Sequence, residues 1–150
     1  MKNTRWDNRT KKLFLCFFTI MILFSFDSYA KKVSFLSSSI VPAARGYVNV
    51  TIDKNKNYVI DIQISDLAEV NRLQPSKHAY VVWILTDQEI TKNLGQIISK
   101  ASQNAKKLTA SFEVISPAKP IKIFITAEND ASTQNPGDQV VLSTDRFFLD

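Results

Sequence analysis

Residues that could carry out chemistry are few in this 150-residue chain. His78 is the only histidine, so a Ser-His-Asp triad would have to be built around it, and a metal site with several histidine ligands is excluded. Because His78 directly precedes the apolar run 79–85, we expect it to mark a strand end rather than to act as a catalytic base. The three glycines, Gly46, Gly95 and Gly137, are isolated and form no phosphate-binding loop. The sequence therefore predicts a protein that is not an enzyme.

The segment Asp53-x-Asn55-x-Asn57 has the spacing that begins a calcium-binding loop. Such a loop needs glycine where this chain has Tyr58, and a bidentate glutamate where it has Ile64. Aspartate and asparagine also tolerate the left-handed backbone of tight turns and bond to their own main chain. We therefore expect a hairpin turn here, joining two antiparallel strands.

A second candidate cation site consists of Glu128, Asp130 and Asp138, which lie in or beside one expected loop, 127–139. Three carboxylates on one loop can converge on a hard cation, so a weak cation site is an alternative here. Charged loops are more often only solvated. We expect solvated side chains and no cofactor.

Residues 1–30 have the organisation of a signal peptide. A basic stretch comes first, 14 uncharged residues follow at 13–26, and small residues precede the bond between Ala30 and Lys31. We expect cleavage at that bond, which leaves one domain of residues 31–150. An uncleaved membrane anchor is the alternative, although a spanning helix needs about 20 apolar residues.

The composition of the predicted mature chain differs from that of the whole sequence. The whole sequence carries 19 basic and 14 acidic residues, and residues 31–150 retain 14 and 12 of them. Their lysines are scattered, so nucleic acid is not an expected partner. The only cysteine, Cys16, is removed with the signal, which leaves neither a disulfide nor a thiolate metal site. A chain of about 120 residues must then be stabilised by burial alone, in a single core.

The strongest structural signal is the uncharged run 79–85, which contains Tyr80 and Trp83. It lacks the polar breaks of an amphipathic helix, so it predicts a central strand with both faces covered and both aromatic residues in the core. We expect a polar crossover at 67–76 and a turn at 86–93, and only 98–107 could hold a short helix. Further strands are predicted at 33–35, 48–52, 60–64, 94–97, 108–114, 121–127 and 139–143. Seven or eight short strands predict an all-β antiparallel sandwich.

Four short motifs, taken in chain order, resemble a known family. They are Tyr80-Val81-Val82-Trp83-Ile84, Asn93-Leu94-Gly95-Gln96, Ile125-Thr126-Ala127-Glu128-Asn129-Asp130, and Pro136-Gly137-Asp138-Gln139-Val140-Val141-Leu142. This order is similar to the extracytoplasmic domain of anti-sigma-K-type factors, over roughly residues 45–143. The resemblance implies an immunoglobulin-like sandwich on the outer side of a bacterial cytoplasmic membrane. We expect no counterpart of the family's sigma-binding segment, because the 12 residues before the apolar run contain neither Cys nor His.

We therefore expect a non-enzymatic interaction module of the bacterial envelope, periplasmic or secreted, with an unidentified envelope protein or small ligand as partner. It would meet a membrane only through its signal sequence during export. The alternative function is a small-ligand or glycan binder that uses aromatic residues at a loop end: Tyr47, Tyr58, or Phe147 and Phe148. The C-terminal segment 145–150 is expected to be one more edge strand, with an exposed docking tail as the alternative.

Overall fold

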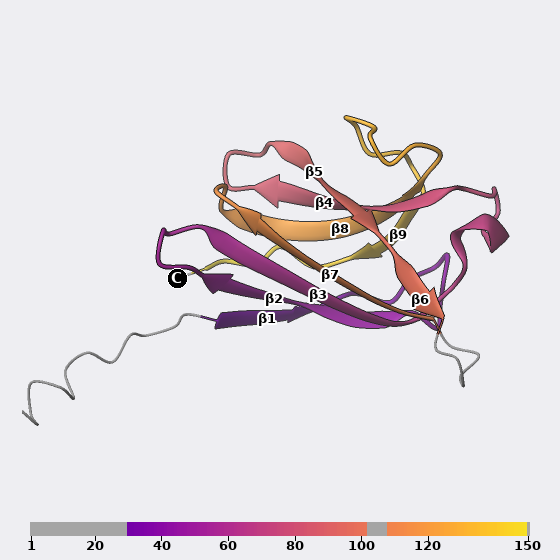
Figure 1. The fold of residues 1–150 in the computed structure, drawn as a ribbon, viewed down its shortest axis with the longest axis horizontal. Helices are drawn as coiled ribbons and strands as arrows, with labels where there is room; N and C mark the ends of the chain where they lie inside the picture. The colour runs from indigo at the N-terminus through magenta and orange to yellow at the C-terminus, as the bar shows by residue number, and fades with distance from the viewer. Residues whose placement is uncertain (1–29, 102–107, 150) are drawn as a thin grey trace, which may run out of the picture.

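The computed structural model describes residues 30–101 and 108–149. Within these ranges, nine strands form two antiparallel sheets that pack face to face (Figure 1). The five-stranded sheet contains, in spatial order, β1 (Ala30–Ser34), β2 (Arg45–Ile52), β3 (Tyr58–Leu67), β7 (Leu108–Ser116) and β6 (Ser99–Ala101). The four-stranded sheet contains β5 (Thr91–Ile97), β4 (Ala79–Thr86), β8 (Pro120–Glu128) and β9 (Val140–Ser143). The predicted all-β sandwich is confirmed, with more strands than expected.

The strand order is that of an immunoglobulin-type sandwich. In the five-stranded sheet, β2, β3, β7 and β6 take the places of strands A, B, E and D, and in the other sheet β4, β8 and β9 take those of C, F and G. The chain crosses from one sheet to the other three times, between β3 and β4, between β5 and β6, and between β7 and β8. β1 and β5 add one edge strand to each sheet.

The main core lies between the sheets and uses alternate residues of each strand. Val48 and Val50 of β2, and Ile60 and Ile62 of β3, are fully buried there, as the alternation at 48–52 and 60–64 predicted. Their neighbours along the strand point to the outer face, because side chains alternate across a sheet.

β4 has both faces covered, as its uncharged sequence predicted. Tyr80 and Ile84 point into the main core. Val81 and Trp83 point to the opposite side, where they form a separate small cluster with Ala79. The prediction that Trp83 is a core residue is therefore confirmed: its side chain is fully buried, in the cluster on the outer side of the four-stranded sheet.

Three predicted boundaries change in the structure. The first strand is Ala30–Ser34 rather than 33–35, and Phe35 forms an isolated bridge with Thr144. The turn predicted at 86–93 is shorter: Thr86 N donates to Ile90 O at 3.0 Å, so β5 begins at Thr91. The crossover predicted at 67–76 begins inside β3 and contains a 3-10 turn, η1 (Val70–Arg72).

The C-terminal segment extends past β9 along the start of β8. Phe147 N donates to Ile121 O at 2.8 Å, and the side chains of Phe147 and Leu149 are buried. The segment is thus packed against the sandwich, although it is not an additional regular strand. Phe148 is 70 % exposed.

Two predictions fall wholly or partly outside the described ranges. The predicted signal peptide lies there except for Ala30, the first residue of β1, so the predicted cleavage bond to Lys31 falls at the start of that strand. Of the possible helix at 98–107, residues 99–101 form strand β6 instead. Within the described ranges, no helical segment has the length and hydrophobicity that a bilayer crossing requires.

Candidate functional site

The outer face of the five-stranded sheet carries mostly amide, hydroxyl and charged side chains. The strand register arranges them in rows across the sheet. Cross-strand neighbours on one face lie about 5 Å apart at Cβ, so each row forms a continuous surface. One row is Ser34, Tyr47, Gln63 and Ser111, and the next is Lys32, Asn49, Asp61 and Glu113.

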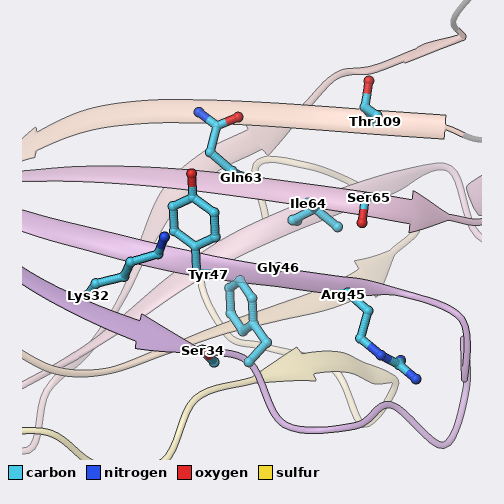
Figure 2. A pocket seen from close by; sticks show the side chains of 10 residues that line it. Lys32, Ser34, Arg45, Gly46, Tyr47, Gln63, Ile64, Ser65 and Thr109 are labelled. Atoms are coloured by element: carbon cyan, nitrogen blue, oxygen red, sulfur yellow. The ribbon is translucent and has the colours of Figure 1, made fainter.

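An open cavity of about 560 Å³ lies on this face around Tyr47 (Figure 2). Apolar lining comes from Phe35, Ile64 and the ring of Tyr47, Gly46 contributes backbone, and the other lining residues are polar or charged. Figure 2 shows the Tyr47 ring reaching across the sheet toward Gln63 of β3. The cavity therefore combines two aromatic rings, those of Phe35 and Tyr47, with hydrogen-bonding groups around them.

Two contacts fix the side chains at the centre of the cavity. Lys32 Nζ lies 3.7 Å from the centroid of the Tyr47 ring, a cation-π contact that covers one ring face. Gln63 Nε2 donates to Asp61 Oδ1 at 2.8 Å, which orients the amide. Because both pairs are held within the protein, their positions are set before any ligand arrives.

Arg45 also lines the cavity, but its charge is directed elsewhere. Its Nη1 donates to the carbonyl oxygens of Pro42 at 2.6 Å and Ala44 at 2.7 Å. Figure 2 shows the side chain pointing away from Tyr47. The positive charge beside the aromatic ring is therefore that of Lys32.

Gly46 permits the close approach of β2 and β3 at the cavity. A Cβ at this position would lie 2.4 Å from the backbone carbonyl oxygen of Gln63. Any side chain here would force the two strands apart, and so would move Tyr47 and Gln63 relative to each other.

The outer face of the four-stranded sheet is covered by the chain itself. The segment 129–138 folds over it, and Ala131 packs against the small cluster that contains Trp83. Trp83 stacks on Phe124 with ring centroids 6.3 Å apart and planes inclined by 14°. Trp83 therefore has no exposed surface for a ligand.

A chain of buried hydrogen bonds links Trp83 to this covering segment. Trp83 Nε1 donates to Thr126 Oγ1 at 2.8 Å, and that hydroxyl donates to Glu128 Oε1 at 2.5 Å. Gly137 N donates to the same carboxylate oxygen at 2.7 Å. From β5, Asn93 Nδ2 donates to the carbonyl oxygens of Ala131 and Thr133 at 2.9 and 2.8 Å. The segment is thus held at both of its ends.

The cation site considered for Glu128, Asp130 and Asp138 is not formed. Glu128 is buried and bonds inward, which also corrects the expectation of a solvated side chain. Asp130 Oδ1 accepts hydrogen bonds from Ser132 N and Oγ, and these lower the pKa of Asp130 below its ordinary value. Among the residues described, no three His, Cys, Asp or Glu side chains gather so that they could hold a metal ion.

The turn at 53–57 is confirmed as the connection between β2 and β3. Asp53 Oδ1 accepts from Asn55 N and Asn57 N, both at 2.8 Å, and Lys56 has the left-handed φ of 63°. The hydrogen bond from the Asn57 backbone lowers the pKa of Asp53. The aspartate therefore closes its own turn.

His78 lies at the start of β4, as predicted. Its backbone N donates to Glu128 O at 2.9 Å, which extends the pairing of β4 with β8 by one residue. Its exposed side chain has Nδ1 3.2 Å from the carbonyl oxygen of Asn129. The contacts of His78 are thus those of a residue that joins a strand end to a loop.

The aromatic residues considered for ligand binding do not lie together. Tyr47 is on strand β2 rather than at a loop end, and it lines the cavity described above. Tyr58 lines a different cavity. Phe147 is buried, which excludes it from direct binding, and Phe148 is exposed.

Sequence reasoning did not find Lys32, Asn49, Asp61 and Gln63 as site residues. The alternation of 48–52 and 60–64 predicted one wet face for each strand, and Asn49, Asp61 and Gln63 occupy it. The alternation does not specify the strand register, and it is the register that places these residues near Tyr47.

Comparisons with protein-family models, with curated proteins and with solved structures found no match to this chain. The resemblance to the outer domain of anti-sigma-K-type factors therefore rests on the sequence motifs alone.

Proposed function

We propose that the chain is an exported, non-enzymatic binding module that holds a saccharide on the open face of its five-stranded sheet. The observation that carries this proposal is the cavity around Tyr47, where an aromatic ring lies among amide and hydroxyl groups. A sugar ring has an apolar C–H face and a rim of hydroxyls. It is matched by a surface that offers one flat apolar ring and many hydrogen-bonding partners.

The contacts of Tyr47 suggest how the sugar would lie. Lys32 covers one face of the ring, so the sugar stacks on the other face. Gln63 lies opposite Tyr47 on the neighbouring strand and lines the same cavity, where it can bond to the sugar hydroxyls. The volume of about 560 Å³ is within the range of small-molecule sites.

The proposal that the module is exported rests on residues 1–30, whose basic stretch, apolar run and small residues fit a signal peptide. Intact mass of the protein expressed with its own N-terminus in a bacterial host tests it. A soluble envelope species that begins at Lys31 is expected. A full-length species in the membrane pellet would contradict cleavage.

Saccharide binding is tested by calorimetry on the exported protein, with maltotetraose, chitotetraose and tetragalacturonate as probes of neutral, N-acetylated and acidic sugars. We expect at least one to bind, and Tyr47→Ala to weaken it by about tenfold or more, since a central aromatic contact commonly dominates an interface. Phe148→Ala removes an exposed aromatic side chain elsewhere and is the matched control. Absence of binding to all three probes, or equal binding by Tyr47→Ala, would overturn the proposal.

Tryptophan emission is not suited to this test. Trp83, the only tryptophan beyond residue 30, is fully buried under the segment 129–138 on the other sheet. Its emission reports on that segment, not on Tyr47.

A protein partner is the second candidate function, and the free edge of β1 favours it. β1 pairs only with β2, and Phe35 N bonds to Gly46 O, so alternation turns the backbone groups of Lys32 outward. After β1, the bridge between Phe35 and Thr144 covers the edge. The edge along β1 can accept a strand from a partner. An envelope protein bound there is also what the likeness to the anti-sigma-K outer domain suggests.

Proline at position 32 distinguishes this candidate from the first. Lys32→Pro removes an outward N–H without removing a bond to β2, so it blocks an added strand, whereas Lys32→Ala does not. An envelope protein that cross-links to the parent and to Lys32→Ala, but not to Lys32→Pro, supports strand addition. Equal cross-linking of both variants contradicts it.

A further inference from the structure

A second cavity lies at one end of the sandwich, separate from the Tyr47 cavity. It has a volume of about 280 Å³ and sits among the turns that connect β2 to β3, β4 to β5, and β7 to β8, on the left in Figure 1. Each turn contributes a lysine at or near it: Lys56, Lys92 and Lys119. Asp87 is the only acidic residue in the lining.

The other carboxylates of these turns are engaged elsewhere. Asp53 bonds to the backbone of its own turn through Asn55 and Asn57. Glu89 accepts two hydrogen bonds from Arg146 in a bidentate ion pair. Nη1 donates to Oε1 at 2.7 Å, and Nη2 donates to Oε2 at 2.8 Å. Neither acid is therefore available to neutralise the cavity.

The ammonium groups of the three lysines form no ion pair with the residues that the structure describes. No carboxylate of that part of the chain lies within the 4.0 Å of an ion pair from any of them. With Asp87 counted against them, the lining carries an excess of two positive charges. Like charges that share a cavity repel one another, and an anion between them relieves that repulsion.

We propose that this cavity binds a phosphate group. A phosphate monoester carries close to two negative charges near neutral pH, which matches the excess charge of the lining. Its three terminal oxygens can each accept from a different ammonium group, and lysine binds phosphate as a point charge. A single carboxylate would leave one positive charge uncompensated. This site goes beyond the saccharide proposal and does not depend on it.

The first test measures binding of inorganic phosphate, free glycerol phosphate and vesicles that contain phosphatidic acid, a lipid with a phosphate monoester headgroup, by the exported protein at low salt. Lys56→Gln, Lys92→Gln and Lys119→Gln are each expected to weaken binding at least about fivefold, the effect of one unit charge facing another at contact distance in water. Lys54→Gln, in the same turn as Lys56 but outside the lining, is the matched control and leaves binding unchanged. Physiological salt weakens all of these interactions.

The arms of the experiment distinguish the sources of the phosphate. Binding of the free phosphates, lost in the lysine variants, identifies the group itself as the ligand. Binding of vesicles alone, lost in the same variants, assigns the site to a lipid headgroup. No binding in any arm, or binding that the triple lysine variant retains, overturns the proposal.

Asp87→Asn tests the proposed charge balance through a readout that loss of a structural contact would not produce. It removes the one negative charge of the lining, so phosphate should bind more tightly, by about fivefold. Unchanged or weaker binding would contradict the proposed balance of charge. Tyr47→Ala should leave phosphate binding unaltered, so failure here and failure of the saccharide proposal are separate results.

Discussion

The two outer faces of the sandwich share one backbone geometry but differ in what covers them. On the four-stranded sheet, Trp83 is fully buried under the segment 129–138. On the five-stranded sheet, Tyr47 is only partly buried and is contacted by the ammonium group of Lys32. An aromatic residue on an outer face is therefore part of a second core in one case and part of an open cavity in the other.

Hydrogen bonding separates the two faces in the same way. Glu128 accepts from a hydroxyl and a backbone N–H that fix the covering segment in place. Asp61 accepts from the side chain of Gln63, its neighbour on the same exposed face. The first acid stabilises the fold, and the second orients a group that faces solvent. Three matched pairs of substitutions can test this difference.

The largest effect is expected for the aromatic pair. Trp83→Ala should lower the free energy of unfolding by about 3–5 kcal/mol, because it empties a fully buried site. Tyr47→Ala should cost less than about 1 kcal/mol, because the ring is only partly buried. Urea unfolding followed by circular dichroism measures both. Equal losses of unfolding free energy would mean that both faces stabilise the fold to the same extent, which contradicts the proposed difference.

The acid pair should follow. Glu128→Ala leaves the Thr126 hydroxyl and Gly137 N without their acceptor, and is expected to cost about 1–3 kcal/mol. Asp61→Ala is expected to lower the free energy of unfolding by no more than about 0.5 kcal/mol, since water replaces the lost hydrogen bond on an open face. A change for Asp61→Ala as large as that for Glu128→Ala would show that the open face also stabilises the fold.

The amide pair is expected to differ less. Asn93→Ala removes both side-chain bonds to the segment 129–138, and should cost about 1 kcal/mol and shift Trp83 emission to longer wavelength as water reaches the ring. Asn49→Ala, on the open face, should change neither quantity. Unaltered emission in Asn93→Ala would contradict the anchoring role of this residue.

The smallest effect is expected away from both faces, at the ion pair between Glu89 and Arg146. The hydrogen bond from Arg146 lowers the pKa of Glu89 below its ordinary value of 4.5. The stabilisation is therefore present above that value and is lost as the pH falls through the lower pKa of the folded state. Arg146→Gln should remove this part of the acid dependence. Unfolding midpoints measured from neutral pH downward should converge for parent and variant at the acid end.

Much of the fold was predictable because strand patterns are local. The uncharged run 79–85 required cover on both faces, and the alternation of 48–52 and 60–64 required cover on one. Asp53 predicted its turn through its own hydrogen bonds. Each of these patterns depends only on residues that are close in the sequence, so it can be recognised without knowing the fold.

The cover of Trp83 and the composition of the Tyr47 cavity were not predictable in the same way. The segment 129–138 is polar apart from Ala131, Pro136 and Gly137, and it is held in place by Glu128 at its start and by Asn93 from the distant strand β5. Lys32 and Gln63 reach Tyr47 only through the register of β1, β2 and β3. Both features depend on pairing between separated segments, which a single sequence does not specify.

The central claim is that the open face binds a ligand while the covered face is structural. The most direct test follows backbone amide shifts of the exported, isotope-labelled protein while the best-binding tetrasaccharide is added. The largest changes are expected at Lys32, Tyr47 and Gln63, with none across 129–138. Changes centred on 129–138, or no changes at any sugar concentration, would contradict the account.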